Sequence, residues 1–184
     1  MGVAPSFQTF AAGYAVRPCL NRLYDGAAAL AAFFMVLLLI AVLLSVTSRV
    51  LGFNVPGIDM YAGYMMAGAG FLALAHTLKK GEHIRVTLVL QALSPTMRRW
   101  MERGSLVVAV LLAALLAWYS ARLCFQSYQF NDISTGNDAT PLWIPQLTMA
   151  VGTLILLVAF IDELVLEWTG KRVQNSSAES LHIE

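Results

Sequence analysis

The chain has 184 residues, of which 58% are hydrophobic and only 12% are charged. Soluble domains usually carry about 25% charged residues, so this composition argues against a water-soluble protein and for a surface that faces lipid. The net charge of +1 gives no reason to expect a nucleic-acid partner, because the basic residues are divided among separate segments and do not form one surface.

The N-terminal quarter of the chain divides into two parts. Residues 1–25 mix polar, basic and apolar side chains, and we expect them to be a cytoplasmic lead-in to the first helix. Residues 26–46 carry no charge, and about 20 apolar residues suffice to cross roughly 30 Å of hydrocarbon as a helix. The sequence therefore predicts the first transmembrane helix over residues 26–46.

The second span is predicted at residues 58–78, after a segment rich in turn-forming residues. Asp59 falls in its first turn, where the positive end of the helix dipole stabilises a carboxylate. A stripe of small residues follows along one face of the helix, namely Gly63, Ala67 and Gly70. Small residues let another helix approach closely, so we expect the stripe either to pack within this chain or to dock a partner.

The segment of residues 79–103 is the only charge-dense stretch between two apolar runs, and it holds six of the 12 Lys and Arg residues. Within it, residues 84–93 are apolar but too short to span, which favours a helix lying in the cytoplasmic membrane interface. A short strand is the alternative, because apolar residues alternate there. Gly81 is expected to cap the second helix. His83 and Arg85 are expected to bind backbone groups or phospholipid headgroups.

The C-terminal half is predicted to hold two more helices. A Ser-Pro pair marks the start of a third helix over residues 95–128, whose membrane-spanning part is residues 104–125. The fourth span is predicted at residues 147–166. Residues 169–184 are polar and are expected to form a disordered cytoplasmic tail.

The basic residues set the orientation, since cytoplasmic loops of membrane proteins are enriched in Lys and Arg. Placing residues 79–103 in the cytoplasm also places both termini there. Ten of the 12 basic residues are then inside, and only Arg49 and Arg122 are outside. The predicted fold is an all-α membrane protein with four transmembrane helices within residues 26–168. A short cytoplasmic interfacial helix lies between the second and third, and both termini are cytoplasmic.

Ionisable residues inside a membrane are functional candidates by default, and here all of them lie near an end of a predicted span. Asp59 and Arg122 lie at the outer boundary, and His76, Asp162 and Glu163 near the inner one. Substrate and ion sites of transporters usually lie near the midplane, so this chain alone is not expected to move a solute. It has no catalytic or metal-binding motif, and one histidine in a span cannot form a facing pair for haem. Neither an enzyme nor a bound cofactor is expected.

The longest loop on the outer side precedes the fourth span. Its polar part carries Asp132 and Asp138. Trp143, between Pro141 and Pro145, is expected to anchor the end of the loop at the membrane interface. A loop that is flexible in its middle and anchored at one end suits docking of a soluble partner, with the acids steering the encounter. A solvated connector without a partner is the alternative.

Short motifs lie at the ends of the predicted helices. They are Arg49 with Phe53 after the first helix, Asp59 at the start of the second, the segment Gly81-Glu82-His83-Ile84-Arg85-Val86, and Pro141, Trp143 and Pro145 at the start of the fourth. Together they resemble the small membrane subunit (the Q, or DctQ-type, component) of tripartite ATP-independent periplasmic (TRAP) transporters. The likeness covers residues 25–168, and the GEHIRV segment carries it most specifically.

The resemblance implies a division of labour among three proteins. A large membrane subunit holds the sodium and substrate sites and moves as an elevator, and a soluble periplasmic protein delivers the substrate, mostly an organic acid. This chain would extend the immobile scaffold in the bacterial inner membrane and offer part of the docking surface. Sodium ions are expected in the large subunit and not here. A membrane anchor for a redox or other enzyme complex is the alternative, and a stand-alone small exporter is a third reading.

Overall fold

Four α-helices make up the structure, a computed structural model that describes residues 7–53, 55–79 and 95–169. The helices are α1 (Phe7–Leu51), α2 (Ile58–Lys79), α4 (Pro95–Gln129) and α5 (Trp143–Trp168). Each contains a stretch long and apolar enough to cross a membrane. The prediction of an all-α protein with four candidate spans is confirmed.

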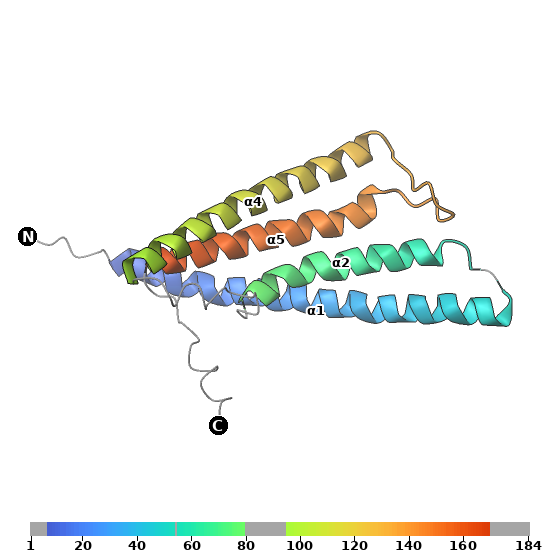
Figure 1. Ribbon diagram of the computed structural model, residues 1–184, viewed down its shortest axis with the longest axis horizontal. Helices are drawn as coiled ribbons and strands as arrows, with labels where there is room; N and C mark the ends of the chain where they lie inside the picture. The colour runs from blue at the N-terminus through green and yellow to red at the C-terminus, as the bar shows by residue number, and fades with distance from the viewer. Residues whose placement is uncertain (1–6, 54, 80–94, 170–184) are drawn as a thin grey trace, which may run out of the picture.

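The helices form one open layer in the order α1, α2, α5, α4 (Figure 1). α2 packs on α1 and on α5, and α5 packs on α4, while α1 and α4 form the two edges. One end of the layer carries the start of α1 and the end of α5, and we call it the terminal end (Figure 1). The opposite end carries the short turn between α1 and α2 and loop 130–142 between α4 and α5, and we call it the loop end.

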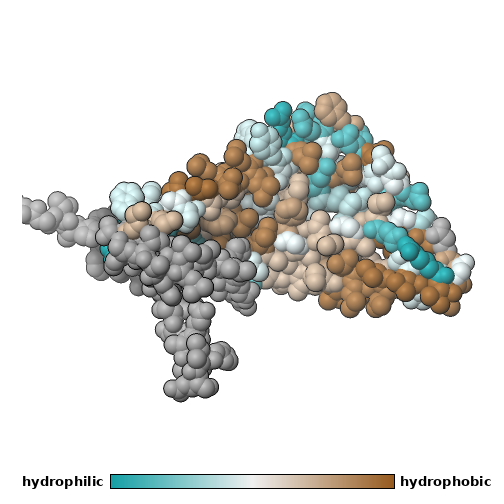
Figure 2. All heavy atoms as spheres, in the orientation of Figure 1, coloured by the Kyte–Doolittle hydropathy of each residue, from teal (hydrophilic) through white to brown (hydrophobic). Residues whose placement is uncertain are grey.

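Large apolar side chains cover the exposed surface of this layer, as expected where lipid replaces water. Figure 2 shows hydrophobic side chains along the body of the molecule and hydrophilic ones gathered toward the loop end. The buried positions are small instead, and Ala75 of α2 and Ala159 of α5 are fully buried. Small residues let helix backbones approach where burial of apolar surface from water cannot drive association.

α2 and α5 approach each other closely at Gly152. A Cβ atom built on Gly152 would lie 2.6 Å from the carbonyl carbon and oxygen of Phe71. Only a residue without a side chain fits at that distance, so Gly152 sets how closely α5 packs on α2. The sequence analysis did not single out this glycine.

Several helix boundaries differ from those predicted. α2 begins at Ile58 and α4 at Pro95, as predicted. α5 begins at Trp143, one turn before the predicted span. α1 already begins at Phe7, so much of the expected N-terminal lead-in is helical. The predicted interfacial helix at residues 84–93 lies outside the described residues, as does nearly all of the predicted tail.

Candidate functional site

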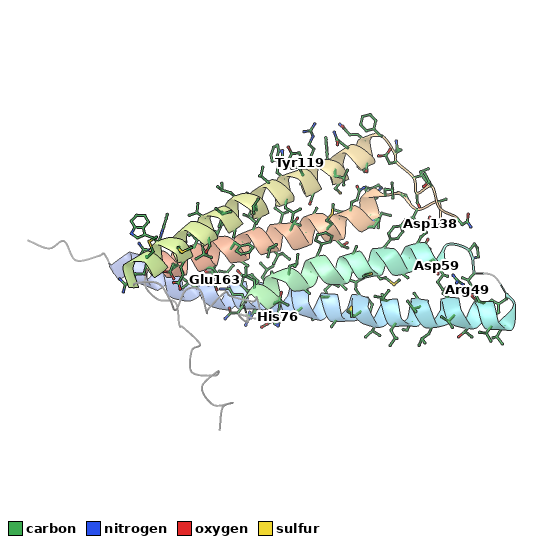
Figure 3. All side chains as sticks on the ribbon, viewed as in Figure 1. Arg49, Asp59, His76, Tyr119, Asp138 and Glu163 are labelled. Atoms are coloured by element: carbon green, nitrogen blue, oxygen red, sulfur yellow. The ribbon has the colours of Figure 1, made fainter. Side chains whose placement is uncertain are left out.

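An ion pair joins α1 to α2 at the loop end (Figure 3). Arg49 Nη2, in the last turn of α1, lies 2.9 Å from Asp59 Oδ2, in the first turn of α2. Ser45 Oγ donates to the other carboxylate oxygen of Asp59 at 2.7 Å. Both charges suit the helix dipoles they meet. The side chains are 74% and 62% exposed, so the ion pair adds little to stability and mainly fixes how the two helices meet.

Loop 130–142 has a defined backbone. An antiparallel bridge joins Ile133 to Pro141, and the amide of Leu142 donates to the carbonyl of Asp132 at 3.0 Å. The two arms of the loop therefore hold each other, and its shape does not depend on the membrane surface.

Side chains of α2 hold the middle of this loop. Tyr64 Oη donates to Asp138 Oδ2 at 2.9 Å, and Thr140 Oγ1 donates to Tyr61 Oη at 3.1 Å. Gly57 has φ +80°, and a Cβ atom built on it would lie 3.0 Å from Asp138 Cβ, so the loop also rests on the turn between α1 and α2. The prediction of a loop that is free in its middle is wrong, because these contacts pin the middle to α2.

The two acids of the loop therefore have different roles. Hydrogen bonding to the side chains of Ser134 and Tyr64 holds the pKa of Asp138 below its usual range, so this carboxylate stays charged and takes part in fixing the loop. Asp132 is exposed on the arm of the loop. Of the two acids that the sequence analysis paired, Asp132 is the one placed to meet a partner.

Trp143 lies at the start of α5 and packs against α4. Its ring meets that of Tyr128 edge-to-face at 5.8 Å between centroids, and its carbonyl accepts a bond from Cys124 Sγ at 3.6 Å. Pro145 lies in the first turn of α5, where a missing N–H leaves no helix bond unmade. Trp143 was predicted as a loop anchor, and the structure makes it the first residue of the helix.

A charged cluster joins three helices toward the terminal end. Lys79 Nζ, at the end of α2, pairs with Asp162 and lies 3.8 Å from Glu163 Oε1, both on α5. It also lies 5.4 Å from the ring centroid of Tyr24 on α1. Tyr24 is only 2% exposed. The two acids were predicted to lie near the inner boundary, but their pairing with Lys79 was not predicted. The sequence contains a signal for it, because an adjacent Asp-Glu pair ends one predicted span and a lysine follows another.

A third acid, Asp25, lies near this cluster on α1. Asp25 Oδ1 lies 3.9 Å from His76 Nδ1, and the Asp25 side chain is 74% exposed. His76 is the histidine that the sequence analysis considered, and it lies where the end of α2 meets α1 (Figure 3). Asp25 was missed, because the orientation argument counted only basic residues.

These polar groups mark two levels across the layer. In α1, α2 and α5 the groups at the two ends are separated by about 20 residues, or about 30 Å of helix. The pairs are Tyr24 and Ser45, Asp59 and Lys79, and Trp143 and Asp162. The spacing equals the hydrocarbon thickness of a bilayer, so the two levels are far enough apart to lie at the two boundaries of a membrane. Between the two levels, these three helices carry no Asp, Glu, Lys or Arg apart from Asp25, which directly follows Tyr24.

The two glycines of the predicted small-residue stripe on α2 are not packed against another helix among the described residues. Gly63 and Gly70 are exposed, and a Cβ atom built on either has nothing within 4 Å among the described residues. Ala67, between them, is half-buried. The glycine of α2 that packs inside the layer is Gly68, whose Cβ position lies 3.5 Å from the ring of Phe34. Packing among the described residues therefore does not explain the two glycines of the stripe.

The sequence matches the family model of tripartite ATP-independent periplasmic transporters, DctQ component, over residues 35–170. The chain belongs to the DctQ family. No curated protein matches it. The DctQ match begins inside α1 and ends just past α5, so it includes α2, α4 and α5 completely. The family is that of a transporter component, generally non-catalytic, and membership does not favour an anchor for a redox enzyme.

The residues that carried the DctQ resemblance divide by position. Arg49, Asp59 and Trp143 lie at the loop end, where they connect neighbouring helices. Gly81, His83 and Arg85 lie outside the described residues, so their expected roles stay predictions. Among the residues that the structure describes, no group of three or more His, Cys, Asp or Glu could hold a metal ion.

Proposed function

We propose that this chain is the small, non-catalytic scaffold subunit of a TRAP transporter in the bacterial inner membrane. In this proposal it pairs with the large membrane subunit, which binds sodium and an organic acid and moves between the two sides. A periplasmic binding protein delivers the substrate. The observation that carries the proposal, beside family membership, is that α1, α2 and α5 carry no Asp, Glu, Lys or Arg between the two polar levels apart from Asp25, at the edge of one level. Transporter substrate and ion sites usually need polar groups near the midplane.

Reconstitution tests this function. Proteoliposomes are prepared with this chain alone, with the large subunit alone, and with both, and uptake of labelled organic acids is followed with binding protein and a sodium gradient. We expect uptake only from vesicles that hold both membrane subunits. Uptake by this chain alone would contradict the scaffold role.

Topology gives a second prediction. We propose that the terminal end is cytoplasmic and the loop end periplasmic, because ten of the 12 basic residues then lie inside. Alkaline phosphatase fused at Gly136 should be active, and fusions near Gly81 and at the C-terminus should be inactive. Green fluorescent protein fusions at the same positions should show the reverse pattern. An active phosphatase near Gly81 would rule out this orientation.

Loop 130–142 is proposed to help dock the binding protein, with exposed Asp132 as the steering charge. Asp132→Lys should raise the binding-protein concentration needed for half-maximal uptake about two- to fivefold, the range expected for an exposed charge pair. The maximal rate should stay nearly unchanged, and the effect should shrink at high salt. The control is Tyr64→Phe, which removes a bond to Asp138 and leaves the loop charge intact. Identical curves for Asp132→Lys and wild type at every salt concentration would show a plain connector.

A further inference from the structure

An apolar groove runs along one face of the layer between α1 and α2. It has a volume of about 370 Å³, and its walls are mostly alanine and glycine. They include Ala28, Ala31, Ala32, Ala69, Gly70 and Ala73. The small-residue stripe of α2 continues the groove toward the loop end, through Ala67 to Gly63. An apolar surface about 20 Å long is thus left open along α2, at 1.5 Å of rise per residue.

The chemistry of these walls suits a helix better than a lipid chain. Glycine weakens a helix, because it has the largest backbone entropy to lose. Lipid tails gain nothing from it, whereas a second helix can bring its backbone close over such positions. Elsewhere in the layer Gly152 does this with the backbone of Phe71, and Gly68 makes room for the ring of Phe34. Gly70 has an equally bare surface with nothing within 4 Å of its Cβ position among the described residues.

The charges near the groove also favour a partner helix over a phospholipid. Asp25 lies beside His76, one of the groove residues, at the terminal end of the groove, and it is 74% exposed. Its neighbour Tyr24 contacts the Lys79 cluster, whose cation is already paired with the acids of α5. An anionic phospholipid headgroup at this place would be repelled by Asp25. A transmembrane helix of a partner carries Lys or Arg at its cytoplasmic end by the positive-inside rule, and such a side chain would be attracted.

We propose that this groove receives a transmembrane helix of the large membrane subunit, and that a basic side chain at the cytoplasmic end of that helix pairs with Asp25. The proposal rests on the proposed function for its partner and adds the face and the recognition chemistry. The edge formed by α4 lies on the opposite side of the layer and stays in contact with lipid.

Photocrosslinking in the assembled complex tests the assignment. A benzophenone amino acid is placed at Met35, which lines the groove, or at Leu112, an exposed residue of α4, and the large subunit is co-expressed. Irradiation should join the large subunit to this chain from Met35 and not from Leu112. Crosslinks from Leu112 alone would overturn the groove assignment and leave the scaffold function standing. Crosslinks from Met35 to phospholipid alone would overturn it in favour of an acyl chain.

Matched substitutions test the same surface by assembly. Gly70→Leu should overfill the groove and lower the yield of co-purified large subunit at least tenfold. Gly104→Leu is the control, because Gly104 on α4 also has open space at its Cβ position. Asp25→Lys should reduce assembly more than Asp25→Asn does, because it adds repulsion to a lost attraction. Wild-type yield from both Gly70→Leu and Asp25→Lys would refute the proposal, and failure of the wild-type chain to capture the large subunit would refute the scaffold function with it.

Discussion

Replacing Gly152 by alanine is expected to destabilise the subunit, whereas the same substitution at Gly70 should leave it unchanged or more stable. A methyl group on Gly152 would lie 2.6 Å from the backbone of Phe71, and backbone atoms cannot turn away as a flexible side chain can. α5 must therefore move away from α2 along much of their contact. Overpacking of this kind costs about 1–3 kcal/mol. At Gly70 the methyl group meets open space, and alanine gains about 0.5–1 kcal/mol over glycine in a helix.

Thermal unfolding of the purified subunit in detergent, followed by circular dichroism, measures both effects. Gly152→Ala should lower the melting temperature, and Gly70→Ala should hold or raise it. Gly152→Leu should lower it further, because more atoms must be placed in the same gap. Equal melting temperatures for the two alanine variants would mean that α2 and α5 do not approach as closely as described.

The helices themselves followed from the sequence, because each has a chargeless run of sufficient length between turn formers. The start of α1 did not. Residues 7–25 carry charges and a proline, so a search for apolar spans leaves them out, yet they continue the helix beyond the polar level at Tyr24. Extending a helix that is already nucleated is easier than starting one, so α1 can continue past its apolar stretch without an apolar sequence.

The spacing of the small residues on α2 does not predict which face of the helix is buried. This helix has small residues in two rows at helical spacing, one through Gly63, Ala67 and Gly70 and one in which Gly68 and Ala75 flank Leu72, and only the second row is buried. Both rows repeat with the period of a helix, so the period does not say which row meets a neighbour. The attachment of loop 130–142 to α2 could not be predicted from the sequence either, because it depends on a hydrogen bond between Tyr64 and Asp138, which are 74 residues apart.

The charged cluster at Lys79 gives the other large expected effect. Lys79→Met should destabilise the subunit strongly, because Asp162 would lose its cation while remaining mostly buried, and Glu163 would lose the nearby charge of Lys79. Lys79 and Asp162 are each 21% exposed, and Glu163 is 12% exposed. Removing one partner of a buried ion pair costs about 3–5 kcal/mol, and the partial access of water should keep the loss near the lower end of that range. The cluster joins α1, α2 and α5, so its loss should loosen all three.

Further variants show whether Lys79 stabilises the subunit by its charge or by its packing. Lys79→Arg keeps the cation and should retain most of the stability. Adding Asp162→Asn and Glu163→Gln to Lys79→Met removes the negative charges that Lys79 had faced, so the triple variant should melt above Lys79→Met alone, although it has lost every charge of the cluster. A neutral hydrogen-bonded or apolar replacement of a buried ion pair is often no less stable than the pair itself. If the triple variant instead melts below Lys79→Met, the stem of the lysine and its contact with the Tyr24 ring stabilise the cluster more than its charge does.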